Sequence, residues 1–166
     1  IMKLIYHPDE FLDKKVNEVD LLNPGFDPKE LKKQMVDLML ASKGIGLSAN
    51  QIGLNAQVFV MGENIDNAII CINPEVLQHT EETVVDTEGC LSFPNIFVKV
   101  TRPKEILVKY YNEDLKEIST KVIGYSAKCF LHEWDHLQGI TFKDRVSKLK
   151  WNMAQKKASK LRNMHA

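Results

Sequence analysis

Apolar positions in the first third of the chain follow the period of an α-helix. Asp27 precedes Pro28, which is a typical helix start because aspartate caps the first amides and proline is tolerated at the first helical position. Gly44 is a suitable residue for the end. The helix is therefore predicted from Pro28 to about Gly44, and its methionines are expected to fill the core rather than bind a cofactor. The apolar residues at helical spacing are Leu31, Met35, Leu38 and Met39.

The middle of the chain has a different pattern. β-branched and aromatic residues recur between Asn, Gly and Pro breaks, as in short antiparallel strands. The predicted strands cover residues 56–61, 68–72, 96–100, 105–111 and 117–123. A further short strand is predicted at residues 3–6, ending in a turn at His7-Pro8. Residues 79–95 form the longest stretch predicted to be irregular.

A second helix is predicted around residues 131–139, which read Leu-His-Glu-Trp-Asp-His-Leu-Gln-Gly. His132 and His136 are four residues apart, about 400° around a helix, so both imidazoles leave the same face. A histidine pair with a carboxylate beside the first histidine, here Glu133, is typical of a metal site in which the carboxylate handles a proton. The alternative is a chance match on a solvated helix, which the apolar neighbours disfavour.

These elements predict an α+β fold. Short antiparallel strands surround a central metal-binding helix, with an N-terminal helix before it and a basic C-terminal helix after it. The order of elements does not match βαβ winding. A chain of 166 residues with 44% hydrophobic content fits one domain, residues 1–166, that needs no second core.

The C-terminal helix is predicted at residues 148–166, a segment without acidic residues. We expect an apolar stripe along it from Leu149, Met153 and Leu161. Its cationic residues are Lys148, Lys150, Lys156, Lys157, Lys160 and Arg162.

Composition narrows the partners and the compartment. The 22 basic and 22 acidic residues give a formal charge of zero, so no overall field favours nucleic acid or an acidic substrate. The sequence shows neither a signal-peptide core nor an apolar run of membrane-spanning length, and a cytoplasmic location is expected. The cysteines are odd in number and lack C-x-x-C spacing, which favours reduced thiols over disulfides.

Cys90 is the best candidate for a third metal ligand. It follows a glycine in a polar, turn-like stretch, whereas Cys71 and Cys129 have apolar neighbours typical of core residues. A thiolate and two imidazoles would leave one tetrahedral position open for water, as catalytic sites require. The alternative is a free, exposed thiol.

The segment at residues 44–53 is punctuated by glycines but lacks the spacing of a P-loop or a dinucleotide fingerprint. Glycines permit a ligand to approach the backbone closely, and Gln51 brings an amide that could polarise a carbonyl. Taken alone, the segment is better interpreted as a plain helix-to-strand connection with an exposed Gln51.

Three segments together resemble the peptide deformylase family. The family pattern is G-x-G-x-A-A-x-Q, E-G-C-L-S and H-E-x-D-H-L-x-G. The chain reads GIGLSANQ at 44–51, EGCLS at 88–92 and HEWDHLQG at 132–139. The resemblance runs from about the first helix through Gly139. Ser48 replaces the usual alanine and Leu131 the usual glutamine, which bears on packing and on the surroundings of the site rather than on its chemistry.

The resemblance implies that Cys90, His132 and His136 hold one divalent metal. Fe²⁺ is the expected native ion, while family members are often purified with Zn²⁺ or Ni²⁺. The implied reaction is hydrolysis of the N-formyl group from the initiator methionine of nascent polypeptides, with release of formate. Glu133 is then the general base and afterwards the general acid.

The family also implies how the substrate is held. Gln51 and the backbone N–H of Leu91 would stabilise charge on the formyl oxygen. The backbone around Gly46 would pair with the substrate main chain like an added strand, flanked by Ile45 and Leu47. The methionine pocket would be walled by Tyr125 and Cys129, with Lys128 bringing charge to its rim.

Three further expectations concern the surroundings. Arg102 either braces Glu88 or lies on the surface at a strand edge. Asp135 is expected to orient a metal-binding histidine or to cap a neighbouring group. The basic C-terminal helix either docks on the ribosome, as in some family members, or packs on the domain beside a solvated face. No specific DNA and no membrane partner is expected.

Two alternatives to a deformylase come from different classes. A zinc endopeptidase would take a third ligand downstream of the histidine helix, and the one histidine in the sequence after Gly139 is His165. A catalytically inactive relative would bind formylated peptides or ribosomes without turnover, and the intact Glu133 argues against it.

Overall fold

The computed structural model describes residues 2–164 of the chain. The α-helices are α1 (Pro28–Ala41), α2 (Gly124–Leu137) and α3 (Lys148–Met164). The strands are β1 (Gly46–Ser48), β2 (Val58–Met61), β3 (Ile69–His79), β4 (Thr83–Cys90), β5 (Phe93–Pro103), β6 (Glu105–Tyr111) and β7 (Glu117–Ile123). Short 3₁₀ turns are η1 (Glu10–Asp13), η2 (Ala49–Ile52) and η3 (Phe142–Arg145).

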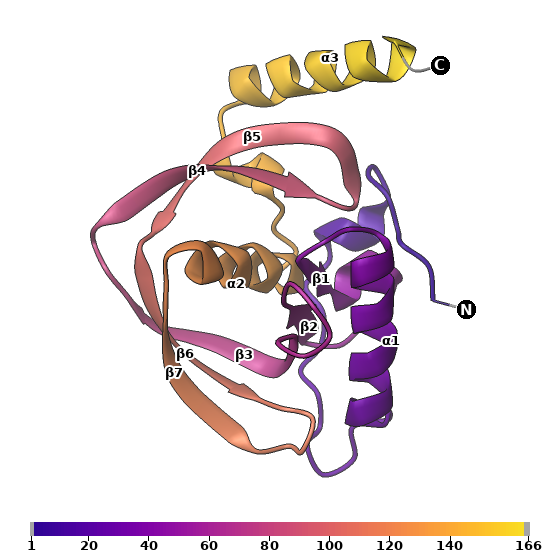
Figure 1. Cartoon of the computed structure of the whole chain (residues 1–166), viewed down its shortest axis with the longest axis vertical. Coiled ribbons are helices and arrows are strands. Elements are labelled where there is room, and N and C mark those ends of the chain that lie inside the picture. The colour runs from indigo at the N-terminus through magenta and orange to yellow at the C-terminus, as the bar shows by residue number, and fades with distance from the viewer. Residues whose placement is uncertain (1, 165–166) are drawn as a thin grey trace.

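Helix α2 lies between two antiparallel sheets (Figure 1). One sheet has five strands in the order β1-β2-β3-β6-β7, so β1 is at its edge. The other is the β4-β5 hairpin. The predicted α+β fold with antiparallel strands around a central helix is confirmed, and this arrangement places the histidine helix against both sheets.

Helix α1 begins where the sequence predicts. Asp27 accepts a hydrogen bond from the Lys29 N–H at 3.0 Å, and Pro28 is the first helical residue. The helix ends slightly earlier than expected, at Ala41, and Lys43 rather than Gly44 adopts the left-handed conformation, with φ of 62°. Gly44 is needed for space, because a Cβ there would lie 2.5 Å from Cδ1 of Leu91.

Two predictions of local structure were wrong, one of a strand and one of an irregular stretch. Residues 3–6 form no strand, and the Ile5 N–H instead donates to the Gln51 carbonyl at 2.7 Å; the expected turn at His7-Pro8 is present. Much of the predicted irregular stretch 79–95 is β4. Seven of the eight β4 residues are at least partly exposed, so the strand has no apolar alternation and is defined by its pairing with β5.

Among residues 2–164, the buried apolar residues fall into a larger and a smaller cluster, and the expectation of one domain stays a prediction. The larger cluster lies among α1, α2 and the five-stranded sheet, where the rings of Phe59 and Phe130 meet edge to face at 5.0 Å. The smaller cluster joins β5 to η3 and α3. Its centre is a group of rings from Phe93, Phe142 and Trp151.

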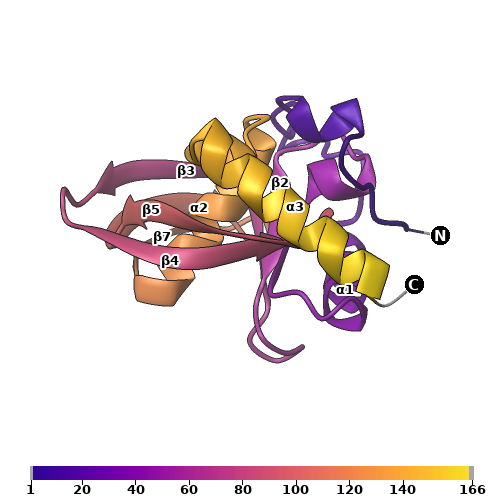
Figure 2. The ribbon, with the colours of Figure 1, turned by 90° about the horizontal axis from the view of Figure 1, so that it is seen from above.

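Helix α3 is present as predicted, but a different face is buried. Trp151 and Ala158 pack on the domain, whereas Leu149 is 71% and Met153 62% exposed. The expected apolar stripe was therefore wrong, because α3 lies across the outside of the hairpin and only one narrow face meets it (Figure 2). Residues 165–166 of the predicted helix, including His165, lie outside the described residues.

Among residues 2–164, no helix combines the length and the apolar character that crossing a membrane requires.

Candidate metal centre and substrate cavity

The end of β4 and the middle of α2 bring together three side chains that could hold a metal ion. Cys90 is the last residue of β4, where the pairing with β5 is irregular after Gly89. His132 and His136 lie one turn apart on α2. The ligand atoms of the three residues are all within 4.8 Å of one another, and Cys90 Sγ lies 3.4 Å from His136 Nε2. The grouping predicted from the sequence is therefore present in space.

Within the described part of the chain, residues 2–164, two polar atoms beside this group have no hydrogen-bond partner. Glu133 Oε1 and His136 Nδ1 are both buried and unpaired. Buried polar atoms are nearly always satisfied, and leaving one unpaired costs about 1–3 kcal/mol. Glu133 also lines a cavity, so its unpaired oxygen indicates a site completed by a bound group, whereas His136 turns Nε2 and not the unpaired Nδ1 toward Cys90. The thiolate and imidazole donors suit Fe²⁺, Co²⁺, Ni²⁺ or Zn²⁺, so the residues present fit a divalent metal.

Burial controls the charge of the helix residues. It lowers the pKa of His136 well below the ordinary value, which keeps the ring neutral as a metal ligand must be. It raises the pKa of Glu133 to about 7, an effect that the nearby His132 opposes. For His132, burial lowers the pKa, but contacts with Cys90 and Glu88 outweigh this and raise it. Binding of a metal by His132 would displace that proton.

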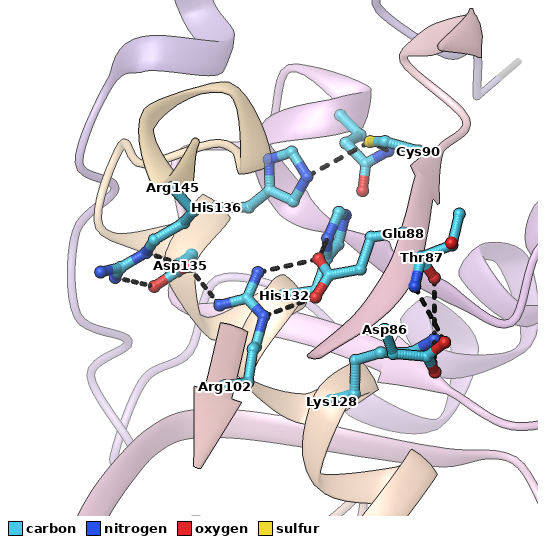
Figure 3. Close-up of polar contacts among 11 residues, drawn as sticks. Asp86, Thr87, Glu88, Cys90, Arg102, Lys128, His132, Asp135, His136 and Arg145 are labelled. Atoms are coloured by element: carbon cyan, nitrogen blue, oxygen red, sulfur yellow. Dashed lines mark hydrogen bonds and ion pairs between the residues drawn. The ribbon is translucent and has the colours of Figure 1, made fainter. Parts of the chain in front are cut away.

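A chain of buried ion pairs supports His132 (Figure 3). Arg102 on β5 donates two hydrogen bonds to Glu88 on β4, at 2.7 and 2.9 Å, and one to Asp135 on α2, at 2.8 Å. Glu88 also lies 2.9 Å from Nδ1 of His132. Burial opposes ionisation of Glu88, but the hydrogen bonds from Arg102 and His132 lower its pKa to about 2. The carboxylate thus fixes the ring and directs Nε2 away from itself.

Asp135 was expected to orient a histidine or to cap a neighbouring group, and the first of these roles is not observed. It does not orient a histidine; it accepts hydrogen bonds from Arg102 and from Arg145 on η3, the latter at 2.7 and 3.0 Å. Glu88 takes the histidine instead. Arg102 does brace Glu88, and with 6% of its surface exposed it is not a surface residue. Sequence reasoning missed Arg145, since no motif or spacing links it to Asp135.

Gln51 is buried, with 1% of its surface exposed, so the exposed connection favoured from its segment alone was wrong. Its Nε2 points toward Cys90 Sγ at 3.5 Å and donates to Ser92 Oγ at 3.1 Å. Its Oε1 accepts from the N–H and the hydroxyl of Ser48, at 3.0 and 3.1 Å. Ser48 therefore fixes which end of the amide faces Cys90. Ser92 was missed although it lies within the quoted EGCLS segment.

We refer to Cys90, His132 and His136 together as the metal group. A cavity of about 700 Å³ opens beside it and is lined by Glu133, Gln51 and Cys90. Of the predicted substrate residues, four line this cavity: Ile45, Gly46, Tyr125 and Cys129. Leu91 and Lys128 line it as well. Leu47 does not, because its side chain is fully buried in the larger core.

Gly46 is required by the neighbouring carboxylate. A Cβ at this position would overlap Oε2 of Glu133. Strand β1 can therefore lie directly against the Glu133 side chain only because residue 46 is glycine.

Comparisons with known proteins agree with the sequence motifs. The profile of the polypeptide deformylase family matches residues 1–152. A peptide deformylase of Wolbachia pipientis wMel is 38% identical over 174 residues, covering 98% of this chain and 96% of that relative. A crystal structure of a peptide deformylase from Legionella pneumophila has a TM-score of 0.88 and 32% identity, covering 99% of this chain and 97% of that one. A peptide deformylase from Synechococcus elongatus in complex with actinonin has a TM-score of 0.86 and 31% identity, covering 95% and 86%.

Replacement of Arg102, the buried arginine between Glu88 and Asp135, should destabilise the protein. We expect Arg102→Met to lower the free energy of unfolding by about 3–5 kcal/mol, because it leaves two buried carboxylates without their shared partner. Urea unfolding of the metal-free protein, followed by tryptophan fluorescence, measures this. Arg162→Met removes an exposed arginine of α3 and should change stability by no more than about 0.5 kcal/mol. Equal losses in the two variants would contradict the role given to the ion pairs.

Proposed function

The chain belongs to the polypeptide deformylase family, and we propose that the cavity beside Cys90, His132 and His136 is where it hydrolyses the N-formyl group of the initiator methionine of nascent polypeptides, releasing formate. The observation that carries this assignment is the grouping of the three candidate ligands at a cavity that is lined by Cys90, His132 and Glu133, whose Oε1 is unpaired.

The two sheets offer a track for an extended peptide. Strand β1 is the edge of the five-stranded sheet, and β4 is an edge of the hairpin. The cavity is lined by residues 44–46 on one side and by residues 87–91 on the other. An extended chain placed between them would pair its main chain with one or both edges. Its formyl end would then reach Cys90 and Glu133, with the Gly46 backbone alongside.

Cys90, His132 and His136 would hold a divalent metal, which would supply Lewis acidity for activating water at neutral pH and for polarising the carbonyl oxygen. The chain's own residues handle the proton and the developing charge. The Glu133 carboxylate accepts the proton of the attacking water and delivers it to the leaving amine nitrogen. The Gln51 amide, held by Ser48, and the Leu91 backbone N–H donate to the formyl oxygen as it becomes negative.

Glu133→Gln should remove activity without removing the metal. We expect kcat for formate release from formyl-Met-Ala-Ser to fall by about 10²–10⁴-fold, because the amide cannot accept the proton. Metal content, measured by mass spectrometry, should stay at the wild-type value. Glu81→Gln, which changes an exposed glutamate, serves as the matched control and should be fully active. Folded, metal-loaded wild-type protein that binds the peptide without releasing formate would instead identify a binding protein.

We propose Fe²⁺ as the native metal, because the chain belongs to the polypeptide deformylase family, for which Fe²⁺ is the expected ion, and because thiolate and imidazole donors accept it. These donors also accept Co²⁺, Ni²⁺ and Zn²⁺, so geometry and availability decide among the ions. Protein purified without oxygen from iron-replete cells should carry about one iron per chain, and Cys90→Ala should carry none, because the site loses its thiolate. Zinc alone in fully active, anaerobically purified protein would contradict this assignment.

We also propose that α3 contacts the ribosome and that the protein acts in the cytoplasm, where formylated nascent chains emerge. The support is the exposed row of cations on α3, a helix that lies at the outside of the molecule (Figure 2). Ribosomal phosphates would bind such a helix in a salt-dependent way.

Co-sedimentation with ribosomes at low and high salt tests this contact. The pair Lys156→Glu and Lys157→Glu should weaken pelleting by about tenfold or more, since it reverses two exposed charges that would release counterions. The matched control reverses two exposed lysines elsewhere, Lys33→Glu and Lys116→Glu. Equal pelleting of the two double variants would argue against α3 as the contact.

A further inference from the structure

Lys128 joins the two walls of the substrate cavity. It lies four residues before His132 on α2, so its side chain leaves the helix on the same face. Its Nζ lies 2.9 Å from Asp86 Oδ2 and donates to the Thr87 carbonyl at 3.1 Å, both on β4 (Figure 3). The ammonium is also 4.5 Å from the centre of the Tyr125 ring. It therefore spans the gap between α2 and the hairpin.

This bridge has a hollow on each side. The substrate cavity of about 700 Å³ is lined by Tyr125 and Lys128. A second hollow of about 120 Å³ is lined by the same two residues and by Asp86. Its remaining wall is partly apolar and includes Val84, Val100 and Pro103. Lys128 thus separates the substrate cavity from a smaller space behind it.

We propose that the Lys128–Asp86 bridge determines how long a first side chain the protein accepts, by closing the substrate cavity against this hollow. The inference rests on the proposed function, because it assumes that the first residue of the formylated peptide lies against α2. Lys128 and Asp86 are then specificity-determining residues for the reaction, and neither takes part in the chemistry.

The chemistry of the bridge explains the discrimination. Hydrogen bonds between ionised groups are short and strong, and the Lys128 side chain is only 16% exposed. An unbranched side chain longer than methionine would have to displace the ammonium from its two oxygens and leave this largely buried cation unpaired against hydrocarbon. Without the bridge, such a side chain could extend into the hollow and bury its added methylene groups there.

The bridge can be removed without leaving a buried charge. The Asp86 side chain is 55% exposed, so it remains solvated when Lys128 is truncated. Glu88, two residues further along β4, keeps its own partners Arg102 and His132. Variants of Lys128 and Asp86 are therefore expected to fold and to retain the metal group.

The test compares two formylated tripeptides that differ only in the length of the first side chain. Formyl-norleucyl-Ala-Ser matches methionine in length, and formyl-2-aminooctanoyl-Ala-Ser is longer by two methylene groups. For each variant, kcat/KM for the longer peptide is divided by kcat/KM for the shorter one. We expect Lys128→Ala to raise this ratio by about tenfold or more, since one methylene group can contribute a factor of about ten. Asp86→Ala should change the ratio in the same direction by less, because the Thr87 carbonyl still holds the ammonium.

Two variants serve as controls. Lys128→Arg keeps a cation that can reach Asp86 and should keep the wild-type ratio. Lys104→Ala changes a lysine that lines the hollow but not the substrate cavity, so it should also keep the ratio. Circular dichroism and metal content establish that each variant is folded and loaded; if Lys128→Ala does not fold, Asp86→Ala decides.

Binding measurements separate this inference from the proposed function. Calorimetry of both uncleaved peptides with Glu133→Gln protein, with and without Lys128→Ala, should show the same change in preference. Binding that changes in this way, combined with no formate release by the wild type, would overturn the proposed reaction and leave the length selection standing. A ratio unchanged within twofold in folded Lys128→Ala and Asp86→Ala would overturn the length selection.

Discussion

The buried guanidinium of Arg102 is the interaction on which the site depends. It joins β5, β4 and α2 through Glu88 and Asp135, and so fixes the distance between the hairpin and the helix that carries the histidines. Cys90 is on one side of that gap and His136 on the other. Each buried carboxylate would be costly alone, and the planar guanidinium satisfies both with good geometry. The group of Cys90, His132 and His136 is thus held together by ion pairs, between two clusters of apolar residues that stay separate.

The parts of the fold that could be predicted are those with a local signal. Helix α1 has its cap, its proline and its apolar period within one segment, and β6 and β7 are rich in β-branched and aromatic residues. Strand β4 has no such signal, because its outer positions face solvent and its conformation comes from pairing with β5. The prediction of which face of α3 is buried was wrong for a related reason. Leu149 and Met153 gave a plausible stripe, but Trp151 is the side chain that reaches the aromatic group on the domain.

The site follows the same division between local and distant information. Ligand chemistry and helical spacing were enough to select Cys90, His132 and His136 before any fold was known. The surroundings could not be derived in this way, because they join residues far apart in the chain. Nothing in the sequence states that Glu88 rather than Asp135 contacts His132, or that Ser48 holds the Gln51 amide. Gly46 is an intermediate case: a close approach was expected there, and the group that approaches within the protein is the Glu133 carboxylate.

Lys128, His132 and His136 lie on successive turns of α2, so this helix fixes the spacing of all three side chains. A residue inserted between Lys128 and His132 would rotate one relative to the other by about 100° and separate the cavity wall from the metal ligands. Changes of length are therefore incompatible with function inside this helix. Substrate preference in such a protein would therefore change by replacement of residues at fixed positions of α2. The turn between β4 and β5 is held to its length as well, because it carries Leu91 and Ser92 directly after Cys90.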